Sequence, residues 1–166
     1  MKIIEVKGDI TNFPQAEYIC HQCNCVTSNS AHLAKTVFGK FPWADIYKER
    51  ESKTIDYKNF SKGESPGDII VRGNGKDQRY VINMLAQAFP GKPKFPDSKL
   101  DGTKARERYF LMCLKKILDL PNIKSIAFPS KIGCGAAGGD WGRYKMFIEK
   151  FAEHLTDVQV YIVDFN

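Results

Sequence analysis

Residues 125–144, with the sequence SIAFPSKIGCGAAGGDWGRY, constrain the fold more than any other stretch of the chain. Ser125–Phe128 has the β-branched and aromatic character of a short buried strand. Gly133–Gly139 follows and is rich in glycine, so its backbone N–H groups are uncovered and several of its residues can adopt φ > 0. Asp140 then stands at the expected N-cap of a helix. A strand, a glycine loop and a helix in this order predict a turn that binds phosphate.

The helix expected after this loop keeps its apolar residues on one face, at Tyr144, Phe147, Ile148, Phe151, Ala152 and Leu155. Two other interpretations of the loop stay open at this point. A glycine-rich turn can serve only to pack a helix closely against a sheet. Gly133, Gly135 and Gly138 also fit the dinucleotide-binding pattern G-x-G-x-x-G. That pattern opens the first strand–helix unit of a chain, whereas only one strand is expected after this loop, so a nicotinamide-dependent oxidoreductase is disfavoured.

The length of 166 residues predicts a single domain over residues 1–166. No stretch approaches the roughly 18 apolar residues of a membrane span, and the first residues lack the features of a signal peptide. We therefore expect a monomer in the cytoplasm or the nucleus, without a membrane partner. The net charge of +6 favours anionic partners. A solvated basic face explains this charge better than nucleic-acid binding, which rests on charge alone.

The cysteine pattern suits reduced thiols, because the five cysteines are an odd number and three of them are crowded together. Cys20, His21, Cys23 and Cys25 suggest a zinc site as an alternative. Alternate residues of a strand point to opposite faces, however, and no second pair of ligands occurs elsewhere in the chain. We therefore expect no metal and no cofactor.

Strands alternate with helices along the whole chain. The strands are expected at Lys2–Val6, Tyr18–Gln22, Ile69–Arg72, Tyr80–Ala86, Ser125–Phe128 and Val158–Val163, and the helices at Ala31–Phe41, at Thr103–Leu120 with Asp101 or Thr103 as its cap, and after Asp140. Residues 44–66 indicate a helix and then a loop, and residues 90–101 form a long loop. This alternation predicts an α/β fold of three layers, in which helices cover both faces of a mixed, mostly parallel six-stranded sheet.

Ligands of such folds bind at the carboxyl ends of the strands. Four polar or glycine-rich segments follow predicted strands: Gly8–Thr11, Asn24–Ser30, Gln87–Asp101 and Gly133–Asp140. We expect these segments to converge on one cleft.

An ordered set of short motifs also covers nearly the whole chain: V-K-G-D-I-T near the start, H-Q-C-N after the second strand, K-F-P at the end of the first helix, and S-I-A-F-P before the glycine loop. In this combination the chain resembles a macro domain, the ADP-ribose-binding fold. It is similar to the branch that contains ADP-ribose 1″-phosphate phosphatases and terminal ADP-ribose glycohydrolases. The resemblance implies a hydrolase that removes a phosphate, acyl or protein substituent from the distal ribose. The alternative is a reader of free or protein-linked ADP-ribose without turnover.

The resemblance also implies roles for single residues. It places Asp9 at the adenine amino group and the backbone of Ile10 beside the base, while Asn24 matches the position that contacts the distal ribose. His21 matches the histidine proposed as catalytic in the phosphatases, and Asp140 is a further candidate base unless it is only an N-cap. The catalytic set is thus His21, Asn24 and Asp140. The ligand-binding set is Asp9, Ile10, Asn24, Ser30, Ala31, His32, Leu33, Ile132, Gly133, Cys134, Gly135, Ala136, Ala137, Gly138, Gly139 and Val163.

The chain departs from the family pattern in two places. Residues 29–32, which are Asn, Ser, Ala and His, stand where the family carries the glycines of its first phosphate loop. Gln87 and Ala137 occupy the positions of the lysine and the aspartate that the glycohydrolase type uses. The lysine-centred chemistry of that type is therefore not expected here.

Overall fold

The computed structural model describes residues 3–50 and 64–165. Its sheet consists of β1 (Ile3–Lys7), β2 (Tyr18–Gln22), β3 (Ile69–Arg72), β4 (Tyr80–Met84), β5 (Ser125–Pro129) and β6 (Gln159–Asp164). The helices are α1 (His32–Lys40), α2 (Thr103–Leu118) and α3 (Trp141–Glu153), with short 3-10 turns η1 (Ile10–Asn12) and η2 (Pro42–Ala44).

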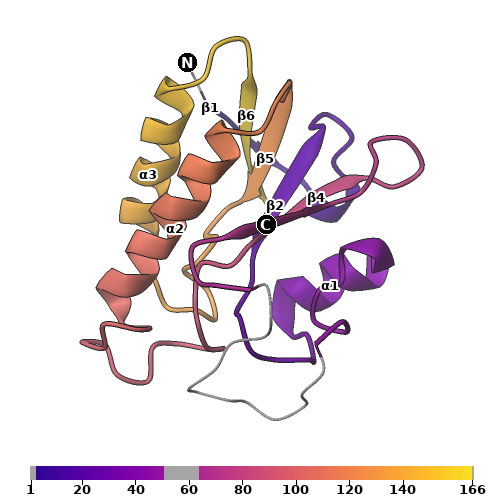
Figure 1. Ribbon diagram of the computed structural model, residues 1–166. Coiled ribbons are helices and arrows are strands. Elements are labelled where there is room, and N and C mark those ends of the chain that lie inside the picture. The colour runs from indigo at the N-terminus through magenta and orange to yellow at the C-terminus, as the bar shows by residue number, and fades with distance from the viewer. Residues whose placement is uncertain (1–2, 51–63, 166) are drawn as a thin grey trace.

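The strands lie in the order β1-β6-β5-β2-β4-β3. All neighbouring strands are parallel except β3 and β4, which form an antiparallel pair. Helices α2 and α3 lie side by side on one face of the sheet and α1 lies on the other (Figure 1). This is the mixed, mostly parallel sheet with helices on both faces that the alternation of elements predicts.

Each face of the sheet has its own hydrophobic core, because successive residues of a strand point to opposite sides. In β5, Ile126 and Phe128 belong to the core between the sheet and the helices α2 and α3. Ala127 belongs to the core on the opposite face, which contains Val37 and Phe38 of α1. The aromatic rings of Phe128 and Phe151 meet edge to face at 5.8 Å in the first core. On the other face, the His21 ring of β2 contacts Phe38 of α1 at 5.1 Å.

Most predicted elements agree with the structure to within two residues, and β2 and β3 have the predicted bounds. The predicted cap of α2 at Asp101 or Thr103 is wrong: the N-cap is Gly102, without a side-chain cap bond. Asp140 does hold the N-cap position of α3, but its side chain makes no cap bond either. The start of the first predicted strand at Lys2 and most of the helix and loop expected for 44–66 lie outside the described residues. No described helix is long and apolar enough to cross a membrane.

Candidate functional site

A cavity of about 510 Å³ opens at the carboxyl ends of β2, β4 and β5. Four parts of the chain surround it: the segment from the end of β2 into α1, Tyr47 after η2, the segment after β4, and the loop after β5. The lining residues are Gln22, Asn24, Thr27, Asn29, Ala31, His32, Leu33, Ala34, Tyr47, Gln87, Pro90, Gly91 and residues 129–137. Three of the four segments that were expected to converge therefore share this cavity, and Gly8–Thr11 does not line it.

The loop after β5 presents backbone donors at the cavity. Its own turns use the N–H groups of Cys134, Gly138 and Gly139. In the described part of the chain, the N–H groups of Gly133, Gly135, Ala136 and Ala137 have no hydrogen-bond partner. Several such amides in one short turn are able to hold an anion, and anion binding by this loop stays a prediction.

Close packing explains two of the loop glycines. A Cβ on Gly133 would lie 2.6 Å from Cε2 of Tyr144, and one on Gly139 would lie 2.6 Å from the Gly133 carbonyl oxygen. Gly133 and Gly138 also adopt φ of 76° and 80°. Gly135 is different, because its φ lies outside the left-handed region and a Cβ there would meet open space. The expectation of φ > 0 at several loop residues thus holds for two of them.

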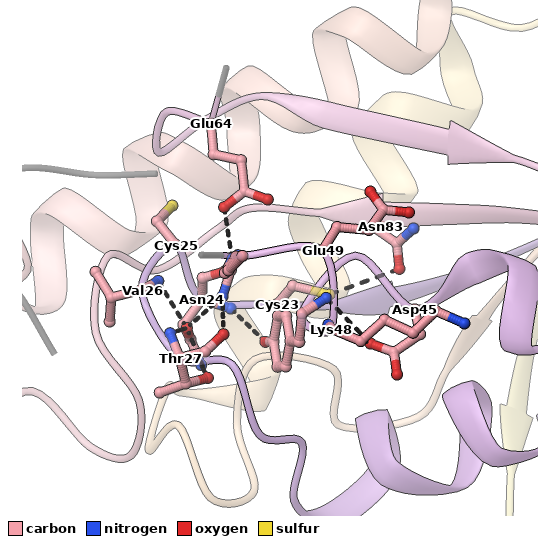
Figure 2. Close-up of polar contacts among 12 residues, drawn as sticks. Cys23, Asn24, Cys25, Val26, Thr27, Asp45, Lys48, Glu49, Glu64 and Asn83 are labelled. Carbon is pink, nitrogen blue, oxygen red and sulfur yellow. Dashed lines mark hydrogen bonds and ion pairs between the residues drawn. The ribbon is translucent and has the colours of Figure 1, made fainter. Parts of the chain in front are cut away.

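A buried arginine holds the β2 side of the cavity. Arg50 donates from Nη2 to the Asn24 carbonyl oxygen (2.6 Å) and from Nη1 to the carbonyl oxygen of Thr27 (2.5 Å), and its Nε pairs with Glu64 at 2.6 Å. The Asn24 side-chain oxygen accepts bonds from the backbone N–H groups of Val26 and Thr27 at 3.0 and 2.9 Å. Figure 2 shows Asn24, Thr27 and Glu64 gathered in this network. Asn24 therefore lines the cavity with a side chain that also fixes its own loop.

A second buried arginine joins the other two walls. Arg106 of α2 uses all five of its N–H donors: two bond the Asp101 carboxylate at 3.0 and 2.6 Å, and three bond the carbonyl oxygens of Phe89, Gly91 and Ala137. Asp101 in turn accepts from the N–H groups of Ala88 and Phe89. The segment after β4 is thereby tied to the glycine loop. Sequence reasoning missed both arginines, because most of their partners are backbone carbonyl groups elsewhere in the chain and no short motif marks them.

His21 lies beneath the site and does not line the cavity. Its side chain is buried, its Nε2 lies 2.5 Å from Oδ1 of Asn83, and Sγ of Cys23 is 3.6 Å from the same nitrogen. Burial lowers the pKa of His21 to about 4, although the bond to Asn83 opposes this. Burial also raises the pKa of the Cys23 thiol well above its usual range. The pair is therefore neutral near pH 7, and within the described chain no group of three His, Cys, Asp or Glu could hold a metal ion.

Several predicted residues are not among those that line the cavity: Asp9, Ile10, Ser30, Gly138, Gly139, Asp140 and Val163. Asp9 caps η1, since its Oδ1 accepts bonds from the N–H and hydroxyl of Thr11 at 2.9 and 2.7 Å. A Cβ on Gly8 would lie 3.6 Å from Val163, so the ends of β1 and β6 adjoin there. Asp140 is exposed at the start of α3.

Gln87, which the sequence resemblance assigns to the lysine position of the glycohydrolase type, is a neutral amide. Gln87 lines the cavity, accepts a bond from the Gln22 side-chain nitrogen at 2.8 Å, and donates to the Phe89 carbonyl oxygen at 2.8 Å. Burial raises the pKa of the Cys134 thiol, in the glycine loop, to about 12. Among the described residues that line the cavity, none is Asp or Glu. The lining therefore offers amide and hydroxyl groups, backbone N–H donors, one lysine and one histidine.

No protein-family model matches the sequence, and no curated protein does. Solved structures of macrodomains match the fold. The macrodomain of Thermus aquaticus DarG is 23% identical, with a TM-score of 0.68 over 98% of this chain and 97% of the other. The macrodomain of Mycobacterium tuberculosis DarG is 18% identical, with a TM-score of 0.69 over 98% of both chains.

A Trypanosoma brucei macrodomain, solved in complex with ADP-ribose, is 17% identical with a TM-score of 0.56. That match covers 99% of this chain and 64% of the other. The chain thus has the three-layer macrodomain fold.

Proposed function

We propose that the chain binds ADP-ribose, or a derivative of it, in the cavity at the carboxyl ends of β2, β4 and β5. The observation that carries this proposal is the turn of unpaired N–H groups at Gly133, Gly135, Ala136 and Ala137 beside a cavity large enough to enclose most of a nucleotide sugar. The diphosphate would lie on these amides, between the glycine loop and the start of α1. The ADP-ribose complex of the Trypanosoma brucei macrodomain supports the same ligand class.

The rest of the ligand follows from the resemblance. Adenine would lie toward Asp9 and Val163, at the ends of β1 and β6, and the distal ribose would lie at Asn24 and Gln87. Each part of the ligand would then meet a different strand end. ADP-ribosylated proteins are candidate partners, because the same pocket can accept the distal end of a protein-linked ligand.

Calorimetry with ADP-ribose, AMP and NAD tests this proposal. We expect ADP-ribose to bind at least tenfold more tightly than AMP, which lacks the second phosphate and the distal ribose, and more tightly than NAD, whose nicotinamide must fit against the distal wall. Equal affinities for NAD and ADP-ribose would show that the distal ribose is not enclosed. No binding of ADP-ribose would refute the proposal.

Hydrolysis of a phosphate, acyl or protein substituent on the distal ribose is the second candidate function. The observation that favours it is the place of Asn24, which lines the cavity where the resemblance puts the distal ribose. We propose that Asn24 positions this sugar while His21, which is buried and bonded to Asn83, supports the strand beneath it. Asp140 stays a candidate base only if a bound ligand reaches the start of α3.

Product analysis separates the two functions. The protein is incubated with ADP-ribose 1″-phosphate, O-acetyl-ADP-ribose and an ADP-ribosylated protein. Release of any of the three substituents would support a hydrolase, and Asp140→Ala should then lower turnover by about 10²-fold or more if that residue is the base. If ADP-ribose binds while all three substrates stay intact, the chain is a reader.

A further inference from the structure

We infer that His32 and Lys131 act as a pair of cations that neutralise the diphosphate of the ligand, in addition to the backbone amides of the glycine loop. This inference rests on the proposed function. Both residues line the cavity, but they come from different elements: His32 begins α1, and Lys131 belongs to the loop after β5. The cavity therefore offers an anion two kinds of group: backbone N–H donors and basic side chains.

The backbone supports this assignment, because both residues adopt a conformation that suits glycine. His32 has φ of 54° and Lys131 has φ of 64°. Two other described non-glycine residues share this region, Asn122 and Asp157, and neither lines the cavity. Asn, Asp and His tolerate positive φ better than most side chains and lysine does so less well, so Lys131 is the more strained residue of the pair. A strained residue at a ligand site indicates that its side chain has a use there.

The charge balance of the cavity points the same way. Among its described lining residues none is Asp or Glu, and within the described chain neither His32 nor Lys131 forms an ion pair. Two basic side chains thus face a cavity without a built-in counterion. An anionic ligand supplies the opposite charge. Both residues are exposed, so this attraction should weaken as the salt concentration rises.

The inferred role of His32 also accounts for one residue of the segment 29–32, where the sequence departs from the family pattern. Where the family carries glycines, this chain keeps a left-handed backbone at residue 32 but places an imidazole on it. His32 thus combines a left-handed backbone with a basic side chain. We expect a ligand with two phosphate charges, such as a nucleoside diphosphate or its sugar ester, to be selected over neutral nucleosides.

Binding measurements on four variants test the pair. His32→Gln and Lys131→Gln remove one charge each, and Lys115→Gln, on the exposed face of α2, removes one charge away from the cavity. The probes are ADP-ribose, ADP and adenosine. At about 20 mM salt, we expect each cavity variant to bind ADP-ribose and ADP about tenfold more weakly. Lys115→Gln should bind like the wild type. The double variant His32→Gln/Lys131→Gln should lose most of the salt dependence of the affinity.

Glycine variants distinguish a role in ligand binding from a purely structural role, because melting temperature and affinity should then change independently. His32→Gly and Lys131→Gly relieve the backbone but remove the charge, so they should keep or raise the melting temperature while binding more weakly. Normal affinity of the four single cavity variants for ADP-ribose would overturn the inference and leave the proposed function intact. If the wild type binds ADP in this charge-dependent way but does not bind ADP-ribose, the inference about the pair holds and the proposed function fails. Absence of binding to all probes would overturn both.

Discussion

Replacement of Arg106 by methionine is the sharpest test of how the cavity is built. The variant removes five N–H donors at once. Among the described residues, the N–H groups of Ala88 and Phe89 are then the remaining donors to the Asp101 carboxylate. The side chains of the ion pair are only 3% and 7% exposed, so the remaining charge stays buried. Breaking a buried pair by removing one partner costs about 3–5 kcal/mol, and we expect a loss near 4 kcal/mol.

Urea denaturation measures this loss, and Arg143→Met is its matched control. Arg143 also makes a two-pronged contact with a carboxylate, that of Glu107, but its side chain is 54% exposed. We expect no measurable change in stability there, because surface pairs contribute little. A double variant Arg106→Met/Asp101→Asn should regain part of the loss, since it removes the stranded charge.

The same variant predicts an effect on binding. Arg106 holds the carbonyl oxygens of Gly91 and Ala137, which belong to two walls of the cavity. Without it these walls are no longer joined, and we expect ADP-ribose affinity to fall about tenfold under conditions in which the protein is fully folded. Arg106→Lys serves as a milder variant for calorimetry. Equal destabilisation of the Arg106 and Arg143 variants would refute the reasoning, and so would unchanged affinity of a destabilised Arg106→Lys.

Three other outcomes are expected. The pKa of His21 is about 4 in the folded protein against about 6.5 when unfolded, so the unfolded state binds the proton first as pH falls. The unfolding free energy should therefore fall by up to about 3 kcal/mol as pH drops from 6.5 to 4. Urea titrations across that range measure this effect, and His21→Gln should remove it. Gly133→Ala should lower the unfolding free energy by about 1–3 kcal/mol because its Cβ meets Tyr144, whereas Gly135→Ala should be neutral in the same assay. Asp9→Ala should weaken ADP-ribose binding by about 1–3 kcal/mol in calorimetry while circular dichroism stays unchanged; equal affinity would show that Asp9 only caps its turn.

Secondary structure could be predicted well where apolar periodicity is strong. The bounds of β2 and β3 agree with the structure, and α2 was expected two residues too long at its C-terminus. The cap of α2 could not be predicted from local sequence, because the Asp101 carboxylate bonds the backbone of Ala88 and the side chain of Arg106. A carboxylate beside a helix start has a strong local preference for capping, and here a long-range partner overrides it.

The cavity could be predicted to the level of segments. Residues at the carboxyl ends of β2, β4 and β5 line it, as the rule for parallel sheets requires. The direction of single side chains could not be predicted in the same way. His21 is the first residue of the H-Q-C-N motif, yet the two-residue period of β2 turns it toward Phe38 on the α1 face, and it does not line the cavity.

The two arginines show what kind of information local sequence lacks. Arg50 and Arg106 each satisfy backbone carbonyl groups of loops that line the cavity, so each loop has a fixed shape before a ligand arrives. Ordering a loop costs conformational entropy, and a loop ordered in advance does not add that cost to binding. Glycine content makes the turn after β5 able to hold an anion, whereas Arg106 keeps that turn in place beside the segment after β4. Affinity at this site should therefore depend on residues of α2 that a bound ligand never touches.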